Sequence, residues 1–119
     1  MAGGSMIDQA VFTRLEEIDG PSFVVKMIEL FRQNLTTQLT KAREGLEQGN
    51  PVQIENAAHS IRSSAGNFSA MELAKLATEI ENEASDWDQE MRKQRINELQ
   101  ELFNQVDQDL QTYLKEKPE

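Results

Sequence analysis

One histidine, His59, and no cysteine stand among the 119 residues of the chain. The lack of cysteine excludes a disulfide framework, a thiolate zinc site and a cysteine nucleophile. A single histidine excludes any site that needs two imidazoles. A neutral imidazole is a competent nitrogen nucleophile, so His59 is the first residue to consider for chemistry on a side chain.

His59 is expected on the outer face of a helix that runs from residue 51 to about residue 65. The apolar positions that form the inner stripe of this helix are Ile54, Ala57, Ala58, Ile61 and Ala65. At about 100° per residue, His59 falls about 140° from Ile54 and should point to solvent. Asn56, Ser63 and Gly66 lie on the same outer side, and Arg62 lies at its margin. These small or polar neighbours would let a protein surface approach the ring closely.

His59 has two other interpretations besides a role as a nucleophile. It could be an ordinary surface histidine, because polar residues are the default at a surface. It could also be a metal ligand, because Glu55 and His59 are four residues apart and share a face. Metal sites in helical bundles, however, use several carboxylates and usually two histidines that project inward. We therefore expect no metal ligands in this chain.

The elements that must position His59 are helices. The chain is rich in Glu, Gln, Leu, Ala and Lys, and its three prolines stand at the edges of segments. Apolar spacings of three and four predict a short helix at residues 9–18 and long helices at residues 22–48 and 51–65. A fourth helix follows to about residue 84, and a last one follows a connection at residues 85–88. We predict an all-α fold, an antiparallel up-down four-helix bundle with a short N-terminal helix covering one end.

The apolar stripes of these helices are the predicted core. Besides the stripe that contains Ile54, one stripe is predicted for each of the other four helices. In chain order they are, for the first helix, Val11, Phe12, Leu15 and Ile18; for the second, Val24, Ile28, Phe31, Leu35, Leu39, Ala42 and Leu46; for the fourth, Leu73, Leu76, Ala77, Ile80 and Ala84; and for the last, Ile96, Leu99, Phe103, Val106, Leu110 and Tyr113.

Residues that cap or stop helices set the expected boundaries. Asp8 and Ser22 are expected to cap the first two helices. Residues 49–51, Gly-Asn-Pro, are expected to end the second helix and begin the third. Residues 66–67, Gly-Asn, predict a left-handed stop, and residues 69–72 read as a capping box for the fourth helix.

Charge and length restrict the classes of function. With 12 basic and 21 acidic residues the net charge is −9, which argues against a nucleic-acid or anionic-membrane surface. No apolar run is long enough for a membrane span, and no signal peptide is visible. Residues 1–5 look like a remnant of cloning, and residues 6–117 are expected to form one domain. The length slightly favours a free-standing protein over a piece of a larger kinase.

The segment around His59 resembles a known motif. Residues 59–70, HSIRSSAGNFSA, resemble the phosphoacceptor motif of histidine-containing phosphotransfer (HPt) domains. In that family a Lys or Arg stands three residues after the histidine, followed by small residues, an apolar residue and a small-Ala pair. Leu73, Ala77, Ile80 and Glu81 match the pattern downstream, and residues 29–31 match it upstream. The resemblance extends from residue 7 to residue 114. The chain has Ser63 and Ser69 where the family often has Gly.

The resemblance implies a phosphorelay intermediate of two-component signalling. His59 would accept a phosphoryl group from a receiver aspartyl phosphate or from a kinase and pass it to a response-regulator Asp. Arg62, a neighbour on the helix surface, would offset the phosphoryl charge. Its plain alternative is a surface Arg paired with Glu55 or another acid. Glu81, at the edge of its core stripe, would accept from one ring N–H and orient the imidazole. Its plain alternative is a surface Glu near Lys75 or Lys93.

The same resemblance defines the expected partners. The chain has no Gly-rich phosphate loop, no nucleotide-binding boxes and no Asp cluster for magnesium, so it is expected to be a phosphocarrier and not an enzyme. No cofactor is expected, and the magnesium would belong to the partner receiver. The partners would be receiver domains of response regulators or hybrid sensor histidine kinases, docking over Asn56, Ser63 and Gly66. A cytoplasmic location is expected.

Two other functions stay open on the sequence. The chain could be a helical-bundle adaptor that binds receiver domains without passing phosphate, for which Ser63 is the sequence support. It could also be an unrelated helical adaptor or a metal-binding bundle.

Overall fold

The computed structural model describes residues 7–68 and 70–115. Its elements are α1 (Gln9–Asp19), α2 (Pro21–Gln48), α3 (Pro51–Asn67), α4 (Met71–Glu83), the short 3₁₀ helix η1 (Ala84–Asp86) and α5 (Gln89–Lys115). No strand occurs in the described ranges, and the predicted all-α class is confirmed. The expected cloning remnant at residues 1–5 lies outside the described residues.

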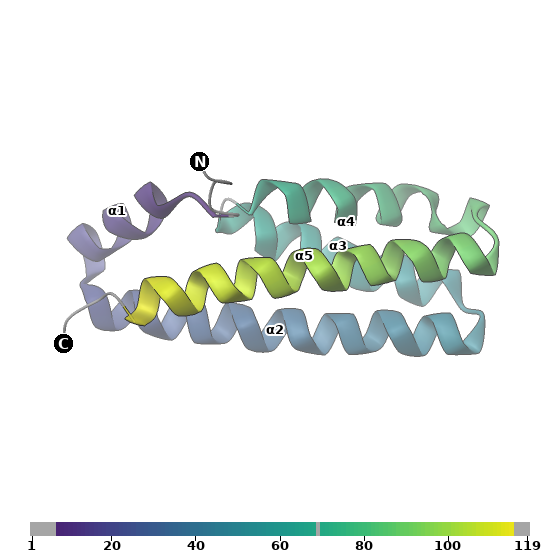
Figure 1. Ribbon diagram of the computed structural model, residues 1–119, viewed down its shortest axis with the longest axis horizontal. Helices are drawn as coiled ribbons and strands as arrows, with labels where there is room; N and C mark the ends of the chain where they lie inside the picture. Colours follow the sequence, from purple (N-terminus) through teal and green to yellow (C-terminus); the bar gives the residue numbers. More distant parts are fainter. Residues whose placement is uncertain (1–6, 69, 116–119) are drawn as a thin grey trace.

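The four longer helices lie side by side along the long axis of the molecule (Figure 1). Successive helices from α2 to α5 run in opposite directions, and α1 lies at the end of the molecule where α2 begins. Packing of α2 on α3, α3 on α4, α4 on α5 and α5 on α2 surrounds one core. The short links between helices place residues distant in sequence on neighbouring helix faces.

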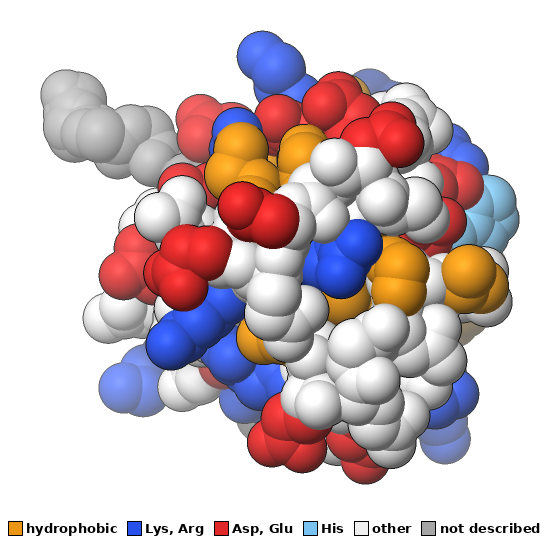
Figure 2. All heavy atoms as spheres, turned by 90° about the vertical axis from the view of Figure 1, so that its right-hand side faces the viewer, with side chains coloured by type: hydrophobic (Ala, Val, Ile, Leu, Met, Phe, Trp, Pro, Cys, Tyr) orange, Lys and Arg blue, Asp and Glu red, His pale blue; other side chains and the backbone are white. Residues whose placement is uncertain are grey.

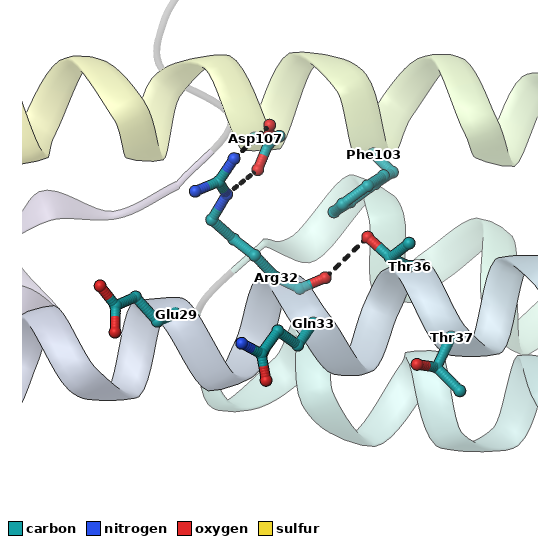
Figure 3. Close-up of a pocket in the computed structure, with 7 residues that line it drawn as sticks. All are labelled: Glu29, Arg32, Gln33, Thr36, Thr37, Phe103 and Asp107. Carbon is teal, nitrogen blue, oxygen red and sulfur yellow. Dashed lines mark hydrogen bonds and ion pairs between the residues drawn. The ribbon is translucent and has the colours of Figure 1, made fainter.

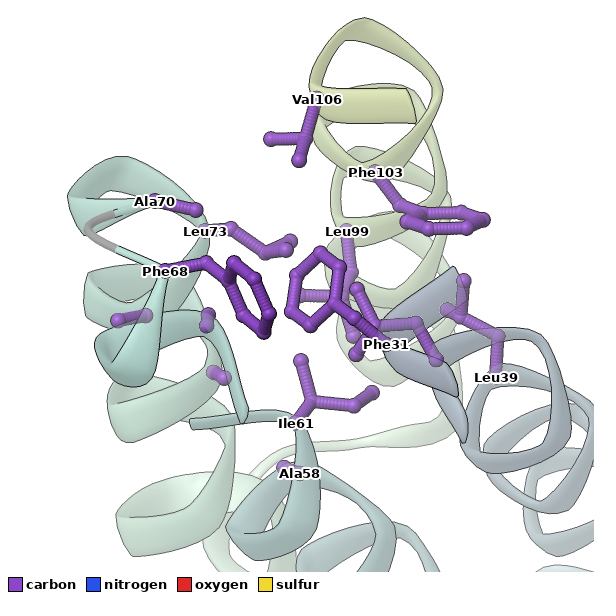
Figure 4. Packing of buried hydrophobic residues seen from close by; sticks show 14 of the residues in the cluster. Phe31, Leu39, Ala58, Ile61, Phe68, Ala70, Leu73, Leu99, Phe103 and Val106 are labelled. Carbon is purple, nitrogen blue, oxygen red and sulfur yellow. The ribbon is translucent and has the colours of Figure 1, made fainter. Parts of the chain in front are cut away.

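The predicted apolar stripes of α3 and α5 are confirmed. The side chains of both stripes are buried: Ile54, Ala57, Ala58, Ile61 and Ala65 of α3, and Ile96, Leu99, Phe103, Val106, Leu110 and Tyr113 of α5. Phe31 and Phe68 meet in the core with their ring centroids 4.5 Å apart, above Ile61 (Figure 4). Burial of the inner stripe of α3 is what turns the opposite face, with His59, toward solvent.

Alanine faces bring α3 and α4 close together. The pair forms the most extensive helix–helix packing in the described chain. Ala57, Ala58 and Ala65 of α3 and Ala74 and Ala77 of α4 are all buried. Small side chains allow two helix backbones to approach closely, so polar side chains at the rim of this interface can reach across it. The imidazole lies on this rim.

A tight turn sets where α3 begins. Gly49 ends α2 in the left-handed conformation, with φ of 64°, and Asn50 accepts a hydrogen bond from the Gln53 amide to cap α3. A Cβ added at Gly45 would lie 3.0 Å from the Asn50 carbonyl oxygen and 3.1 Å from Ile54 Cγ1. The lack of a side chain at Gly45 therefore favours the close approach of the two helices at this turn.

Two helix starts differ from expectation. The second helix begins at Pro21 after Gly20, whose φ is 92°, and Ser22 lies within the helix instead of capping it. Proline suits the first helical position because its φ is preset and its missing N–H is not needed there. Ser69, the expected cap of the fourth helix, lies outside the described residues; the helix begins at Met71, with Ala70 in the capping position.

The end of α3 also differs from expectation. The predicted left-handed stop at Gly66 is wrong, because the described glycines with positive φ are Gly20 and Gly49. The helix continues through Asn67 and ends at Phe68, which has φ of −107°. The Ala65 carbonyl accepts hydrogen bonds from the amides of Phe68 and Ala70 at the end of this helix.

The apolar side predicted for the first helix is buried only in part. Phe12 packs between the rings of Phe68 and Tyr113, whereas Val11 and Leu15 are half-buried and Ile18 is 69% exposed. Phe12 is the buried residue of this helix, and Leu15 packs against the core while remaining partly exposed. Leu46 and Leu76, two other predicted core positions, are likewise only partly buried.

No helix among the described residues is both long and apolar enough to span a membrane.

A hollow of about 830 Å³ lies between α2 and α5 (Figure 3). Its lining includes an ion pair between Arg32 and Asp107 but none of the residues that the sequence singled out for chemistry.

Candidate functional site

His59, Arg62 and Glu81 form one hydrogen-bonded cluster across the α3–α4 interface. The Nδ1 atom of His59 lies 2.6 Å from Oε2 of Glu81. The Nε atom of Arg62 donates to the other carboxylate oxygen, Oε1, at 2.8 Å. One guanidinium nitrogen of Arg62 also lies 3.1 Å from Nδ1 of the ring. The single carboxylate of Glu81 therefore joins both side chains of α3.

The shorter of the two contacts at Nδ1, the one with the Glu81 carboxylate, assigns the tautomer of the ring. An ionised carboxylate only accepts hydrogen bonds, so the 2.6 Å contact requires the proton to be on Nδ1 of His59. The hydrogen bond from His59, followed by that from Arg62, lowers the pKa of Glu81 against the opposing effect of burial. Glu81 is therefore a carboxylate at neutral pH. With Nδ1 protonated in a neutral ring, Nε2 carries the lone pair.

The imidazole is open to solvent on its other side. Its side chain is 57% exposed, against 24% for Glu81 and 39% for Arg62. In Figure 2 the pale-blue histidine lies at the molecular surface beside red carboxylate side chains. Among residues 7–68 and 70–115, no hydrogen-bond partner lies at Nε2. Nε2 is therefore the ring nitrogen that an approaching molecule would meet.

Glu55 has a different partner from those considered for it on sequence. Its Oε2 atom accepts a hydrogen bond from the backbone amide of Ser85, in η1, at 2.8 Å. Arg62 pairs with Glu81 and not with Glu55. No group of three or more potential metal ligands occurs in the described part of the chain. Ser85 carries no signal in the sequence that would pair it with Glu55, because it lies in a connection of irregular geometry.

The residues expected at the docking face are all exposed. Asn56, Ser63 and Gly66 lie on the outside of α3, and a Cβ added at Gly66 would meet nothing within 4 Å. Asn56 and Ser60 also line a shallow hollow of about 430 Å³ between α2 and α3. Its lining contains no carboxylate. The outer face of α3 therefore presents small or polar side chains at these three positions.

One contact near this face was missed from the sequence. The Asn34 amide of α2 donates to the hydroxyl of Ser64 at 2.8 Å. It joins α2 to α3 on the flank opposite the Glu81 cluster. Asn34 lies beside the apolar stripe of α2, where an amide has no distinctive spacing to reveal its partner.

The fold and the cluster define a helical bundle that presents one exposed, carboxylate-paired imidazole. A comparison with protein-family models matches the Hpt domain over residues 26–111, which includes His59, Arg62 and Glu81. The chain therefore belongs to the Hpt domain family, whose members carry phosphoryl groups in two-component signalling and are not kinases. Searches of curated proteins and of solved structures each returned no match.

Proposed function

We propose that His59 is the phosphoacceptor of a phosphorelay. It accepts a phosphoryl group from a receiver aspartyl phosphate or from a kinase and passes it to the Asp of a response regulator. One observation carries this proposal: the exposed ring has Nδ1 held by Glu81, while Nε2 faces solvent with no partner among the described residues. An acceptor must offer its lone pair outward, and this arrangement does so.

Transfer of a phosphoryl group from a receiver aspartate to His59 needs no additional base. The Nε2 lone pair attacks phosphorus, the P–N bond forms, and the P–O bond to the donor aspartate breaks with its electron pair on the leaving carboxylate. The proton on Nδ1 stays where it is, so the ring becomes a phosphorylated imidazolium. The positive charge that develops on the ring lies against the Glu81 carboxylate, 2.6 Å from Nδ1. A preorganised charge of this kind stabilises the transition state.

Arg62 is proposed to neutralise the phosphoryl oxygens. Its guanidinium already lies 3.1 Å from the ring and is tethered by Glu81. Phosphoryl transfer depends mainly on in-line positioning and on offsetting oxygen charge, and the fork of an Arg suits phosphate oxygens. The side chain is 39% exposed, so part of its charge is screened by water.

The partner in this proposal is a receiver domain of a response regulator or of a hybrid sensor kinase. It docks over Asn56, Ser63 and Gly66 and brings the magnesium ion that receiver chemistry needs, so this chain contributes no cofactor. The hollow beside Asn56 has no carboxylate in its lining, which suits an acidic receiver site.

The up-down four-helix bundle is the proposed scaffold, supported by the alternating helix directions in Figure 1. A cytoplasmic location stays a prediction.

The test is transfer of labelled phosphate. The protein is incubated with a receiver phosphorylated on its Asp, and the product is analysed for phosphate that is labile in acid and stable in alkali. Label on His59, mapped by peptide analysis, supports the proposal. A protein that binds several receivers but stays unlabelled would be an adaptor without transfer, and the proposal would be wrong.

A further inference from the structure

The turn that follows α4 is held from two sides. Glu55 of α3 accepts the hydrogen bond from the Ser85 amide at 2.8 Å. Arg92 of α5 donates from Nε to the Ala84 carbonyl at 2.8 Å, and another of its nitrogens lies 3.4 Å from the Ser85 carbonyl. Both Ala84 and Ser85 belong to η1. Side chains of two helices, α3 and α5, therefore bind the backbone of the turn that follows α4.

The Glu55–Ser85 contact is adjacent to the His59–Glu81 contact. Glu55 stands one helical turn before His59 on α3, and Ser85 follows Glu81 by four residues. Because α3 and α4 run in opposite directions, these two bonds are successive contacts along one interface (Figure 1). A shift of the end of α4 away from α3 would lengthen both together.

The Glu55–Ser85 hydrogen bond also engages the Glu55 carboxylate away from the ring of His59. Residues four apart on a helix are surface neighbours, so an unattached Glu55 carboxylate could compete with Glu81 for the ring N–H. Bonding to the Ser85 amide occupies its Oε2 atom instead. A hydrogen bond from a backbone N–H to a carboxylate is charge-assisted and is stronger than one between neutral groups. The imidazole is left with one carboxylate on Nδ1.

We propose that Glu55 is a positioning residue of the phosphoacceptor site. By bonding to the Ser85 amide it holds the end of α4 against α3 and keeps the Glu81 carboxylate on Nδ1 of His59. This inference rests on the proposed function for its effect on transfer, although its effect on the ring is independent of transfer. Glu55 does not touch the reacting nitrogen and acts through Glu81.

The experiment compares four variants by nitrogen NMR of the unphosphorylated imidazole and by the rate of phosphoryl acceptance. Glu55→Ala removes the bond. Glu55→Gln keeps an acceptor oxygen at the same place. Arg92→Ala loosens the same turn from α5. Glu44→Ala removes an exposed carboxylate of α2 and is the matched control.

We expect Glu55→Ala to reduce the fraction of the ring protonated at Nδ1 and to slow acceptance about threefold to tenfold. Glu55→Gln should restore both to within about twofold, and Glu44→Ala should match the wild type. Arg92→Ala should move the ring signals in the same direction as Glu55→Ala, which keeps the test decisive if Glu55→Ala fails to fold. A loss of thermal stability with unchanged ring signals would mean a merely structural role and would overturn the inference.

The two proposals fail in distinguishable ways. If Glu55→Ala shifts the ring signals but even the wild type never accepts phosphate, the proposed function is wrong and the positioning of the ring stands. If the wild type is phosphorylated normally and Glu55→Ala leaves both ring signals and rate unchanged, the positioning role is wrong and the proposed function stands.

Discussion

The molecule carries two similar ion pairs on two of its flanks. On the α3–α4 flank, Arg62 donates to Glu81; on the α2–α5 flank, Arg32 donates to Asp107 (Figure 3). The exposed fractions are nearly the same, at 39% and 24% for the first pair and 36% and 20% for the second. Each pair joins two neighbouring helices through one guanidinium and one carboxylate.

The pairs differ in what the second carboxylate oxygen does. Both carboxylate oxygens of Asp107 are occupied by structural partners. Arg32 donates to each of them, and Gln111 donates to Oδ2 at 2.7 Å. Glu81 gives one oxygen to Arg62 and the other to the ring of His59. An ion pair at a surface contributes little to stability on its own. Under the proposed function, the pair on the α3–α4 flank has a chemical role because its carboxylate also holds the ring of His59.

Replacing His59 by Gln should have the largest effect and tests whether the α3–α4 flank is the reactive one. We expect phosphoryl acceptance to fall to background, because no other described side chain of the cluster offers a nucleophilic nitrogen. The free energy of unfolding should change by no more than about 0.5 kcal/mol, because the ring is largely exposed. Labelling assays and urea unfolding measure the two effects. Labelling that persists in His59→Gln would mean that another residue is the phosphoacceptor.

Exchanging each carboxylate for its amide sharpens the comparison further. Glu81→Gln should slow acceptance about tenfold, because a charged hydrogen-bond partner on Nδ1 becomes a neutral one, a loss of about 1.4 kcal/mol in the transition state. Asp107→Asn, the matched change on the other flank, should leave the rate unchanged and lower the free energy of unfolding by about 0.5 kcal/mol. Equal rates for the two variants would remove Glu81 from the site.

Replacing the two arginines should give a smaller difference. Arg62→Ala is expected to slow acceptance about threefold, because the guanidinium is partly exposed and its charge is screened. Arg62→Lys should recover part of the rate, since it keeps the charge but loses the planar fork. Arg32→Ala on the other flank should have no effect on acceptance. A slower Arg32→Ala variant would show that the effect of charge is not local.

The smallest expected effect is a pH dependence of stability. The His59 hydrogen bond, with that from Arg62, lowers the pKa of Glu81 from its ordinary value of 4.5. A carboxyl with a lower pKa in the folded state stabilises the fold above its unfolded pKa and loses that contribution as the pH falls through its folded pKa. Wild type should therefore exceed Glu81→Gln in free energy of unfolding near neutral pH, and the difference should shrink below 4.5. Urea unfolding at several pH values measures it.

The control for this pH effect is the same comparison made in a His59→Gln background. The ring is the first cause of the lowered pKa, so the pH-dependent part of the difference should become smaller there. A difference of the same size with and without His59 would contradict the assigned cause.

The sequence alone was sufficient where one helix decides the outcome. The face of His59 follows from the period of α3, and every predicted apolar position of α3 and α5 is buried. Local interactions also placed the Asp8 cap and the turn at Gly49. The sequence-based predictions were wrong about Ser22 and Gly66, because the signal of a single residue does not by itself decide where a helix begins or ends.

What only the tertiary structure decided is which side chains of different helices meet. The sequence left Glu81 between the ring of His59 and nearby lysines, and left Arg62 between Glu55 and another acid. The structure brings Glu81 to both Arg62 and His59, and gives Glu55 to the Ser85 amide. Periodicity specifies the direction in which a side chain leaves its own helix. Partners across an interface depend on the separation and register of two helices, which the packing of many residues sets together.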